Sequence, residues 1–242
     1  MNLFIPHAFN YDRGRANYPP DWMHQPYWSY FHTYADYTRR ISYMNADSQH
    51  ATNVLLYYPI TTMWAETRPL FSGETDYQQI GQPAAWKNQT VLVNDYYTRI
   101  ILELTNHHWD YNIADDQYIE NARVEGNELV IGPQRFRAII LPPITTLSRT
   151  TLKKLQEFHQ AGGIILGIRL LPTASPETGD NDAVIKAGIA SIFGSGVAGA
   201  QASGGENSGA NTGGSFYIDD SVDALIATLD AHVPKDLSLI HI

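Results

Sequence analysis

Residues 136–168 read FRAIILPPITTLSRTTLKKLQEFHQAGGIILGI, and this stretch decides the fold class. It holds two mainly apolar runs, 136–141 and 164–168, which we expect to be buried strands. Between them the sequence predicts a helix that begins at Ser148 and ends before Gly162 and Gly163. Two strands joined by a helix of this length predict parallel pairing with a right-handed crossover.

The same alternation of strands and helices runs through most of the chain. The expected elements are a strand at 53–58, a helix at about 85–107, a strand at 109–113, a short helix from Asp115, a hairpin turning at Gly126-Asn127, a strand at 216–218 and a helix over 222–229. This order predicts a flavodoxin-like, three-layer α/β domain over residues 51–233.

Composition limits the classes of partner and of chemistry. Hydrophobic residues make up 43% of the chain and charged residues 17%, which is ordinary for a globular protein with a sizeable core. The formal net charge of -9 disfavours nucleic acid, because phosphate needs a basic surface. No apolar run is long enough to predict a membrane span. The chain has no cysteine, so disulfides, thiolate metal sites and cysteine nucleophiles are excluded within it.

The first 50 residues differ from the rest in their aromatic content. A short apolar run ends at His7 and is followed by a loop that carries Tyr11, Asp12 and Arg13. A barrel strand that delivers polar groups to a ligand-facing loop has this pattern. We therefore expect this first element to belong to a larger catalytic domain.

A helix is expected from about residue 27 to residue 44. Its apolar positions recur at three-to-four spacing and predict a face that packs against a neighbouring layer: Tyr30, Tyr34, Tyr37, Ile41 and Met44. Other aromatic residues lie before that stripe or at its start: Tyr11, Trp22, Tyr27 and Trp28. Their rings could stack on sugar faces or form a hydrophobic floor, and the sequence leaves both readings open.

Several other motifs have structural explanations. The glycine pattern Gly194-Ser-Gly196-Val-Ala-Gly199 resembles a dinucleotide fingerprint, but it follows a helical stretch and lies in a glycine-rich loop over 194–215, so no cofactor is expected. His107-His108 at a helix end lacks metal partners at useful spacing, so no metal is expected either. The acidic residues Asp115 and Asp116, followed by Glu120, fit a helix start. Glu66 lies near the expected ligand-binding edge of the sheet, but a lone exposed glutamate is usually structural, so a structural role is expected and ligand binding is the alternative.

Two groups of residues resemble a known family. The first group is His7-Ala-Phe9-Asn-Tyr11, Pro19-Pro20-Asp21-Trp22, Gln25-Pro26-Tyr27-Trp28, Arg39-Arg40-Ile41-Ser42-Tyr43 and residues 54–59. It resembles the junction in large bacterial glycoside hydrolases of the α-L-rhamnosidase type, glycoside hydrolase family 106. The second group is 136–143, 152–158 and 161–163. It is similar to the α/β domain behind the barrel in such enzymes and in related β-galactosidases.

The resemblance covers about residues 1–233 and implies a division of the chain. Residues 1–50 would be the last strand and helix of a (β/α)8 barrel, and 51–233 an accessory domain. His7 would then face the substrate, although a histidine that bridges two loops is the alternative. We expect a carbohydrate site that includes His7, Tyr11, Asp12, Arg13 and Trp28.

No residue of this chain is expected to be catalytic. Glycoside hydrolysis needs two carboxyl groups that flank the scissile bond, and this chain offers no convincing pair, so the catalytic carboxylates are expected upstream of Met1. The isolated chain should then be inactive. The alternative is a non-catalytic α/β interaction or oligomerisation module. An oligomer is compatible with either reading, and a secreted or periplasmic location would suit the full-length glycosidase. Residues 234–242 do not continue the alternation and read as an artefactual tail.

Overall fold

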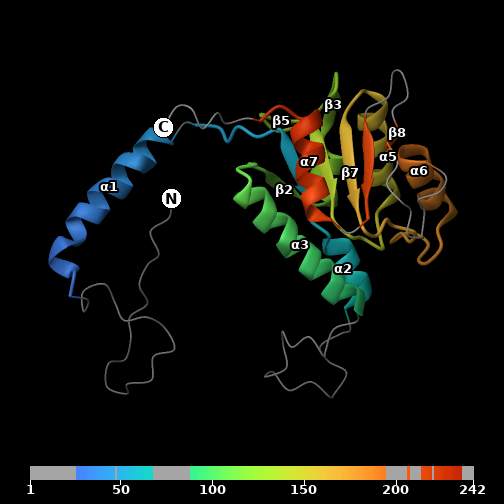
Figure 1. The fold of residues 1–242 in the computed structure, drawn as a ribbon, viewed down its shortest axis with the longest axis horizontal. Coiled ribbons are helices and arrows are strands. Elements are labelled where there is room, and N and C mark those ends of the chain that lie inside the picture. The colour runs from blue at the N-terminus through green and yellow to red at the C-terminus, as the bar shows by residue number, and fades with distance from the viewer. Residues whose placement is uncertain are drawn as a thin grey trace, which may run out of the picture. The chain divides into compact units, whose positions relative to one another are not determined.

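The computed structural model describes residues 26–46, 48–67, 88–194, 206–207, 214–219 and 221–235. The chain divides into two compact units, 1–50 and 51–242, and each is described here by itself (Figure 1). In the first unit the described elements are a 3-10 helix, η3 (Trp28–Tyr30), and the helix α1 (Phe31–Met44).

The second unit contains a mostly parallel sheet with the strand order β2-β1-β6-β7-β9-β8. Its strands are β1 (Val54–Tyr57), β2 (Asn112–Ala114), β6 (Ala138–Leu141), β7 (Ile164–Ile168), β8 (Glu206–Asn207) and β9 (Ser215–Ile218). The first five strands in this order pair in parallel with their neighbours, and β8 pairs antiparallel with β9. The predicted parallel pairing is therefore confirmed, for example by Ile140, which lies opposite Leu166.

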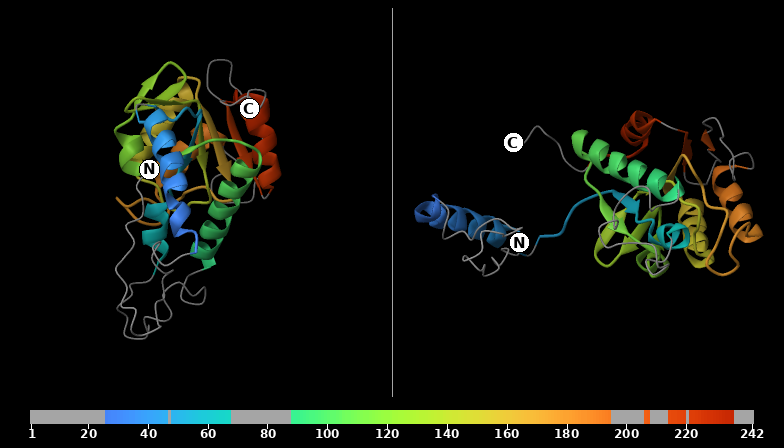
Figure 2. Two further views of the ribbon diagram at one scale, coloured as in Figure 1. Left: turned by 90° about the vertical axis from the view of Figure 1, so that its left-hand side faces the viewer. Right: turned by 90° about the horizontal axis from the view of Figure 1, so that it is seen from below.

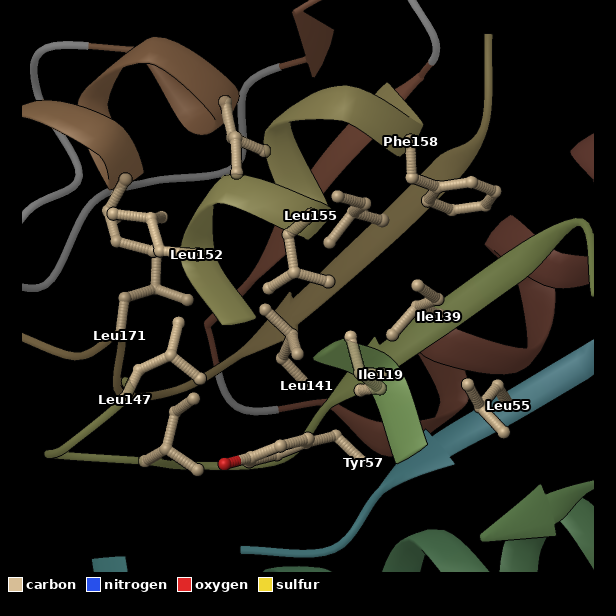
Figure 3. Close-up of a cluster of buried hydrophobic side chains, with 14 of the residues drawn as sticks. Leu55, Tyr57, Ile119, Ile139, Leu141, Leu147, Leu152, Leu155, Phe158 and Leu171 are labelled. Atoms are coloured by element: carbon tan, nitrogen blue, oxygen red, sulfur yellow. The ribbon is translucent and has the colours of Figure 1, made fainter. Parts of the chain in front are cut away.

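Helices cover both faces of this sheet, so the unit has three layers (Figures 1 and 2). The helices are α2 (Ile60–Glu66), α3 (Asn88–Asn106), α4 (Asp116–Glu120), α5 (Arg149–Gln160), α6 (Ala183–Phe193) and α7 (Val222–His232). On one face Leu55, Ile139 and Leu141 pack with side chains of α4, α5 and α6 (Figure 3). On the other face Leu56 and Ile140 pack with side chains of α3 and α7.

The helix ends follow from local sequence. Ser148 caps α5 by accepting a hydrogen bond from the Thr151 backbone N–H at 3.0 Å, as predicted. After this helix Gly162 adopts a φ of +100°, a conformation that glycine reaches without strain. The next residue, Gly163, lies against the Phe158 ring, where a Cβ would come within 2.2 Å of a ring carbon. Both glycines are therefore needed for the turn into β7.

A small antiparallel sheet lies beside the predicted elements, and one of its strands differs from the prediction. Its strands are β3 (Arg123–Glu125), β4 (Glu128–Ile131) and β5 (Gln134–Phe136). The hairpin at Gly126 is confirmed, but the single strand predicted over 136–141 is wrong. Phe136 ends β5 and Ala138 begins β6, and the backbone N–H groups of Arg137 and Ala138 both donate to the Asn53 carbonyl, at 2.8 and 3.0 Å. The chain thus changes sheets at Arg137.

Two further predictions concern the C-terminal part of the second unit. Most of the predicted glycine-rich loop lies outside the described residues, and Glu206–Asn207 within it form β8. In the predicted tail, Pro234 accepts a hydrogen bond from the Asn53 side chain at 3.0 Å, and Lys235 pairs with Asp230 at 3.0 Å. The rest of that tail, 236–242, lies outside the described residues.

Candidate functional site

The expected ligand-binding position in the second unit is the carboxyl edge of the sheet between β1 and β6. From β1 the chain passes to β2 on one side, and β6 lies on the other side of β1. In open α/β sheets, ligands bind outside the carboxyl ends of the strands at such a switch point. Helix α2 follows β1 at this edge, and the loop over 142–148 follows β6.

The hydroxyl of Thr62 joins these two segments. Thr62 is fully buried, and its Oγ1 accepts hydrogen bonds from the backbone N–H groups of Thr145 and Thr146, each at 3.2 Å. The same hydroxyl donates to the Thr146 carbonyl at 3.1 Å. One donor and two acceptor positions are the full capacity of a hydroxyl. Thr62 therefore joins α2, which follows β1, to the loop after β6, and these hydrogen bonds use every position of its hydroxyl.

Glu66 takes part in the same contact between α2 and the β6 loop. Its carboxylate accepts a hydrogen bond from the Thr145 hydroxyl at 3.1 Å, and that hydroxyl lies 3.2 Å from the Thr146 hydroxyl. Glu66 is partly exposed. Of the two readings of Glu66, this geometry favours the structural one, since the carboxylate holds the loop after β6 in place.

A second polar cluster joins α2, α4 and α5 at the same edge. The Asp116 carboxylate accepts hydrogen bonds from the Thr61 hydroxyl and, at 2.7 Å, from the Thr151 hydroxyl. Glu120 accepts from the Ser148 hydroxyl at 2.5 Å. Because hydroxyls of the chain itself occupy these carboxylates, Asp116 and Glu120 are not arranged as an acid and a base that flank a glycosidic bond.

Asp115 confirms the predicted helix start. Its side chain caps α4 by accepting hydrogen bonds from the backbone N–H groups of Gln117 and Tyr118, at 3.1 and 3.3 Å. Asp116 is the first residue of α4, as the predicted acidic helix start requires, and it also joins α4 to α2 and α5. The residues that donate to it lie 55 and 35 positions away in the sequence, and local spacing does not predict them.

Tyr57 is a buried tyrosine at the end of β1, near the Asp116 cluster (Figure 3). The residue has no solvent exposure, and its hydroxyl lies near Asp116 and Thr61 without the geometry of a hydrogen bond to either. Burial raises the pKa of the phenol far above its usual value, and the nearby Asp116 charge raises the pKa further. The phenol is thus protonated at neutral pH and cannot serve there as a base or a nucleophile.

The predicted sugar-site residues fall almost entirely outside the described residues. His7, Tyr11, Asp12 and Arg13 all lie there. Trp28 is described: its side chain is 43% exposed in η3, and its ring stacks on Phe31 with centroids 5.2 Å apart. The ring of Trp28 therefore remains accessible for stacking on a ligand.

The side chains of the predicted apolar stripe are exposed in the structure, and the packing of this stripe against a neighbouring layer stays a prediction. The exposed fractions are 71% for Tyr30, 46% for Tyr34, 64% for Tyr37, 37% for Ile41 and 76% for Met44. The least exposed positions of the helix lie elsewhere, at Phe31, Ala35, Thr38 and Ser42. The stripe therefore forms a large exposed apolar surface on this helix.

The histidine pair and the start of the glycine pattern both lie at helix ends. His107 lies 3.5 Å from Glu103, four positions earlier on α3. In the described part of the chain, no group of three or more histidine, cysteine, aspartate or glutamate side chains could hold a metal ion. Gly194 ends α6 with a φ of +94°, so the glycine pattern follows a helix and not a strand. Gly196 and Gly199 lie outside the described residues.

Sequence reasoning missed one buried ionic network. Asp182 caps α6 through the Val184 backbone N–H and accepts hydrogen bonds from Arg149, at 2.8 and 3.1 Å, and from Ser175 and Thr178, at 2.5 and 2.8 Å. The Arg149 guanidinium, followed by the Ser175 hydroxyl, holds the pKa of the Asp182 carboxyl well below its usual range. The position of Asp182 before an apolar helix is typical of a helix cap, but its ionic partner Arg149 lies 33 positions away, so the sequence does not predict the ion pair.

One surface hollow, of about 750 Å³, is lined by residues of α3 alone. Among them are Asp95 and Arg99, and the Arg99 guanidinium lies 5.2 Å from the centroid of the Tyr96 ring. A binding site normally combines polar groups that converge from several elements. The described residues that line this hollow all belong to α3, so no polar groups from other elements converge on it.

Known structures share the fold of this chain. A rhamnosidase from Novosphingobium sp. PP1Y matches 87% of the chain with a TM-score of 0.50 and 16% sequence identity. Gan42B, a GH42 beta-galactosidase from G. stearothermophilus, and a catalytic mutant of it each match 83% of the chain with a TM-score of 0.52 and 10% identity. No protein-family model and no curated protein matches the sequence.

The chain spans 16% of the rhamnosidase and 33% of the beta-galactosidase. At these identities the likeness shows a fold that also occurs in glycoside hydrolases. None of the described helices combines the length and the apolar composition needed to cross a bilayer.

Proposed function

We propose that this chain is part of a carbohydrate-active glycoside hydrolase of the α-L-rhamnosidase type, family 106. In this proposal, residues 1–50 are the last strand and helix of a (β/α)8 catalytic barrel, and residues 51–233 are a flavodoxin-like accessory domain. The observation that carries the proposal is the fold likeness to a rhamnosidase and a beta-galactosidase over 83–87% of the chain.

Two features of the described residues support this division. The five parallel strands, numbered by their order in the chain, lie in the order 2-1-3-4-5, which is the order of flavodoxin-like sheets. The exposed apolar stripe of α1 needs a partner, because a helix of 14 residues is marginal in water by itself. The other part of a barrel would supply that partner.

The proposed division also assigns the roles of the two parts. The accessory domain supports the barrel and performs no chemistry, in keeping with a carboxyl edge whose polar groups bind one another. His7, Tyr11, Asp12, Arg13 and Trp28 contact the sugar. The two catalytic carboxylates belong to a preceding part of the longer protein.

The experiment compares this chain with a longer version that includes the coding frame before it. Both are assayed with p-nitrophenyl α-L-rhamnoside and p-nitrophenyl β-D-galactoside. We expect activity from the longer protein on the rhamnoside and none from this chain alone. A longer frame without βα units, or a folded longer protein without glycosidase activity, would refute the proposal.

Substitution of His7 tests the sugar site in the longer protein. His7→Ala should lower kcat/KM about tenfold, since one hydrogen bond to a sugar hydroxyl is worth about 1.5 kcal/mol. The matched control is His32→Ala, which changes an exposed histidine of α1 and should leave kcat/KM unchanged. Equal effects of the two substitutions would remove His7 from the site.

The second candidate function is a non-catalytic interaction or oligomerisation module. It is favoured by two features: the polar groups at the carboxyl edge of the sheet bind one another, and the apolar stripe of α1 is exposed. The two candidates differ in the preceding frame: the glycosidase requires several βα units with two acidic residues at strand ends, and the module does not.

A further inference from the structure

We draw no further inference here: the strongest candidate, the side-chain cluster of Asp116, Glu120 and the buried Tyr57 hydroxyl at the carboxyl edge of the sheet, belongs to the site already described, and its carboxylates already accept hydrogen bonds from neighbouring hydroxyls.

Discussion

Helices α1 and α5 have similar lengths, 14 and 12 residues, and both carry an apolar stripe at helical spacing. Their surroundings differ. In α5 the stripe residues Leu152, Leu155 and Phe158 are 2%, 0% and 0% exposed, whereas in α1 Tyr37 and Met44 are 64% and 76% exposed. An amphipathic pattern therefore specifies which face of a helix needs a partner, but it does not specify whether the same chain supplies that partner.

The second unit supplies its own partners for polar groups as well. Thr62 satisfies two backbone donors of the β6 loop, and Asp182 is held by Arg149 and two hydroxyls. Among the buried polar atoms of the described residues, the Tyr57 hydroxyl is an exception. If residues 51–235 fold on these internal contacts, substitutions that remove them should lower the stability of the protein, whereas substitutions on the exposed face of α1 should change it little.

The largest expected effect separates the two helices directly. Phe158→Ala removes a fully buried ring from α5 and should lower the free energy of unfolding by about 3–5 kcal/mol. Tyr37→Ala removes an exposed ring from α1 and should change it by less than about 0.5 kcal/mol. Urea unfolding followed by circular dichroism measures both. A large loss in the Tyr37 variant would show that its ring is covered in this chain.

A second effect depends on pH. The folded-state pKa of Asp182 lies below the unfolded value of about 3.9, so its ionised form stabilises the fold above that pH, and the stabilisation is lost as the pH falls through the folded pKa. The difference in unfolding free energy between the wild type and Asp182→Asn should thus be largest at neutral pH and shrink below about pH 4. Unfolding curves between pH 7 and pH 2.5 measure it. A constant difference would exclude an ionised Asp182 as its cause.

A smaller effect is expected where α2 meets the β6 loop. Thr62→Val keeps the shape but leaves the backbone N–H groups of Thr145 and Thr146 without their acceptor, which should cost about 1–3 kcal/mol. Thr62→Ser retains the hydroxyl and is the matched control, with a smaller loss. If Thr62→Val loses no more stability than Thr62→Ser, which keeps the hydroxyl, the hydrogen bonds of that hydroxyl do not account for the loss.

The smallest effect is expected at Tyr57. Tyr57→Phe removes a hydroxyl that has no partner in the folded state but is hydrated in the unfolded state, so stability should stay within about 0.5 kcal/mol or rise. Thermal and urea unfolding measure the change. A loss of more than about 1 kcal/mol would mean that this hydroxyl makes a hydrogen bond in solution.

The fold was predictable where local pattern and tertiary packing agree. The apolar run 164–168 became β7, and Ser148 with Gly162 set the ends of α5, because capping and buried strands are read from neighbouring residues. The change of sheet at Arg137 was not predictable from such signals. The apolar pattern runs through it, and the Asn53 carbonyl that binds both amides there lies more than 80 positions away.

The candidate site was less predictable than the fold. Asp115 was predicted correctly as a helix start because a cap involves residues two and three positions away. The roles of Asp116 and Glu66 depend on hydroxyls that reach them from other elements. The placement of a sugar site at His7, Tyr11, Asp12 and Arg13 stays a prediction, and Trp28 alone of that group is described, with an accessible ring.

Hydrogen exchange of this chain compares α1 with α5 and tests whether residues 51–235 fold on their own contacts while the exposed stripe leaves α1 less stable. We expect the α5 amides to exchange only through global unfolding of the second unit and the α1 amides to exchange orders of magnitude faster through local opening. Equal protection of α1 and α5 in this chain would contradict it, because α1 would then have its stabilising contacts here.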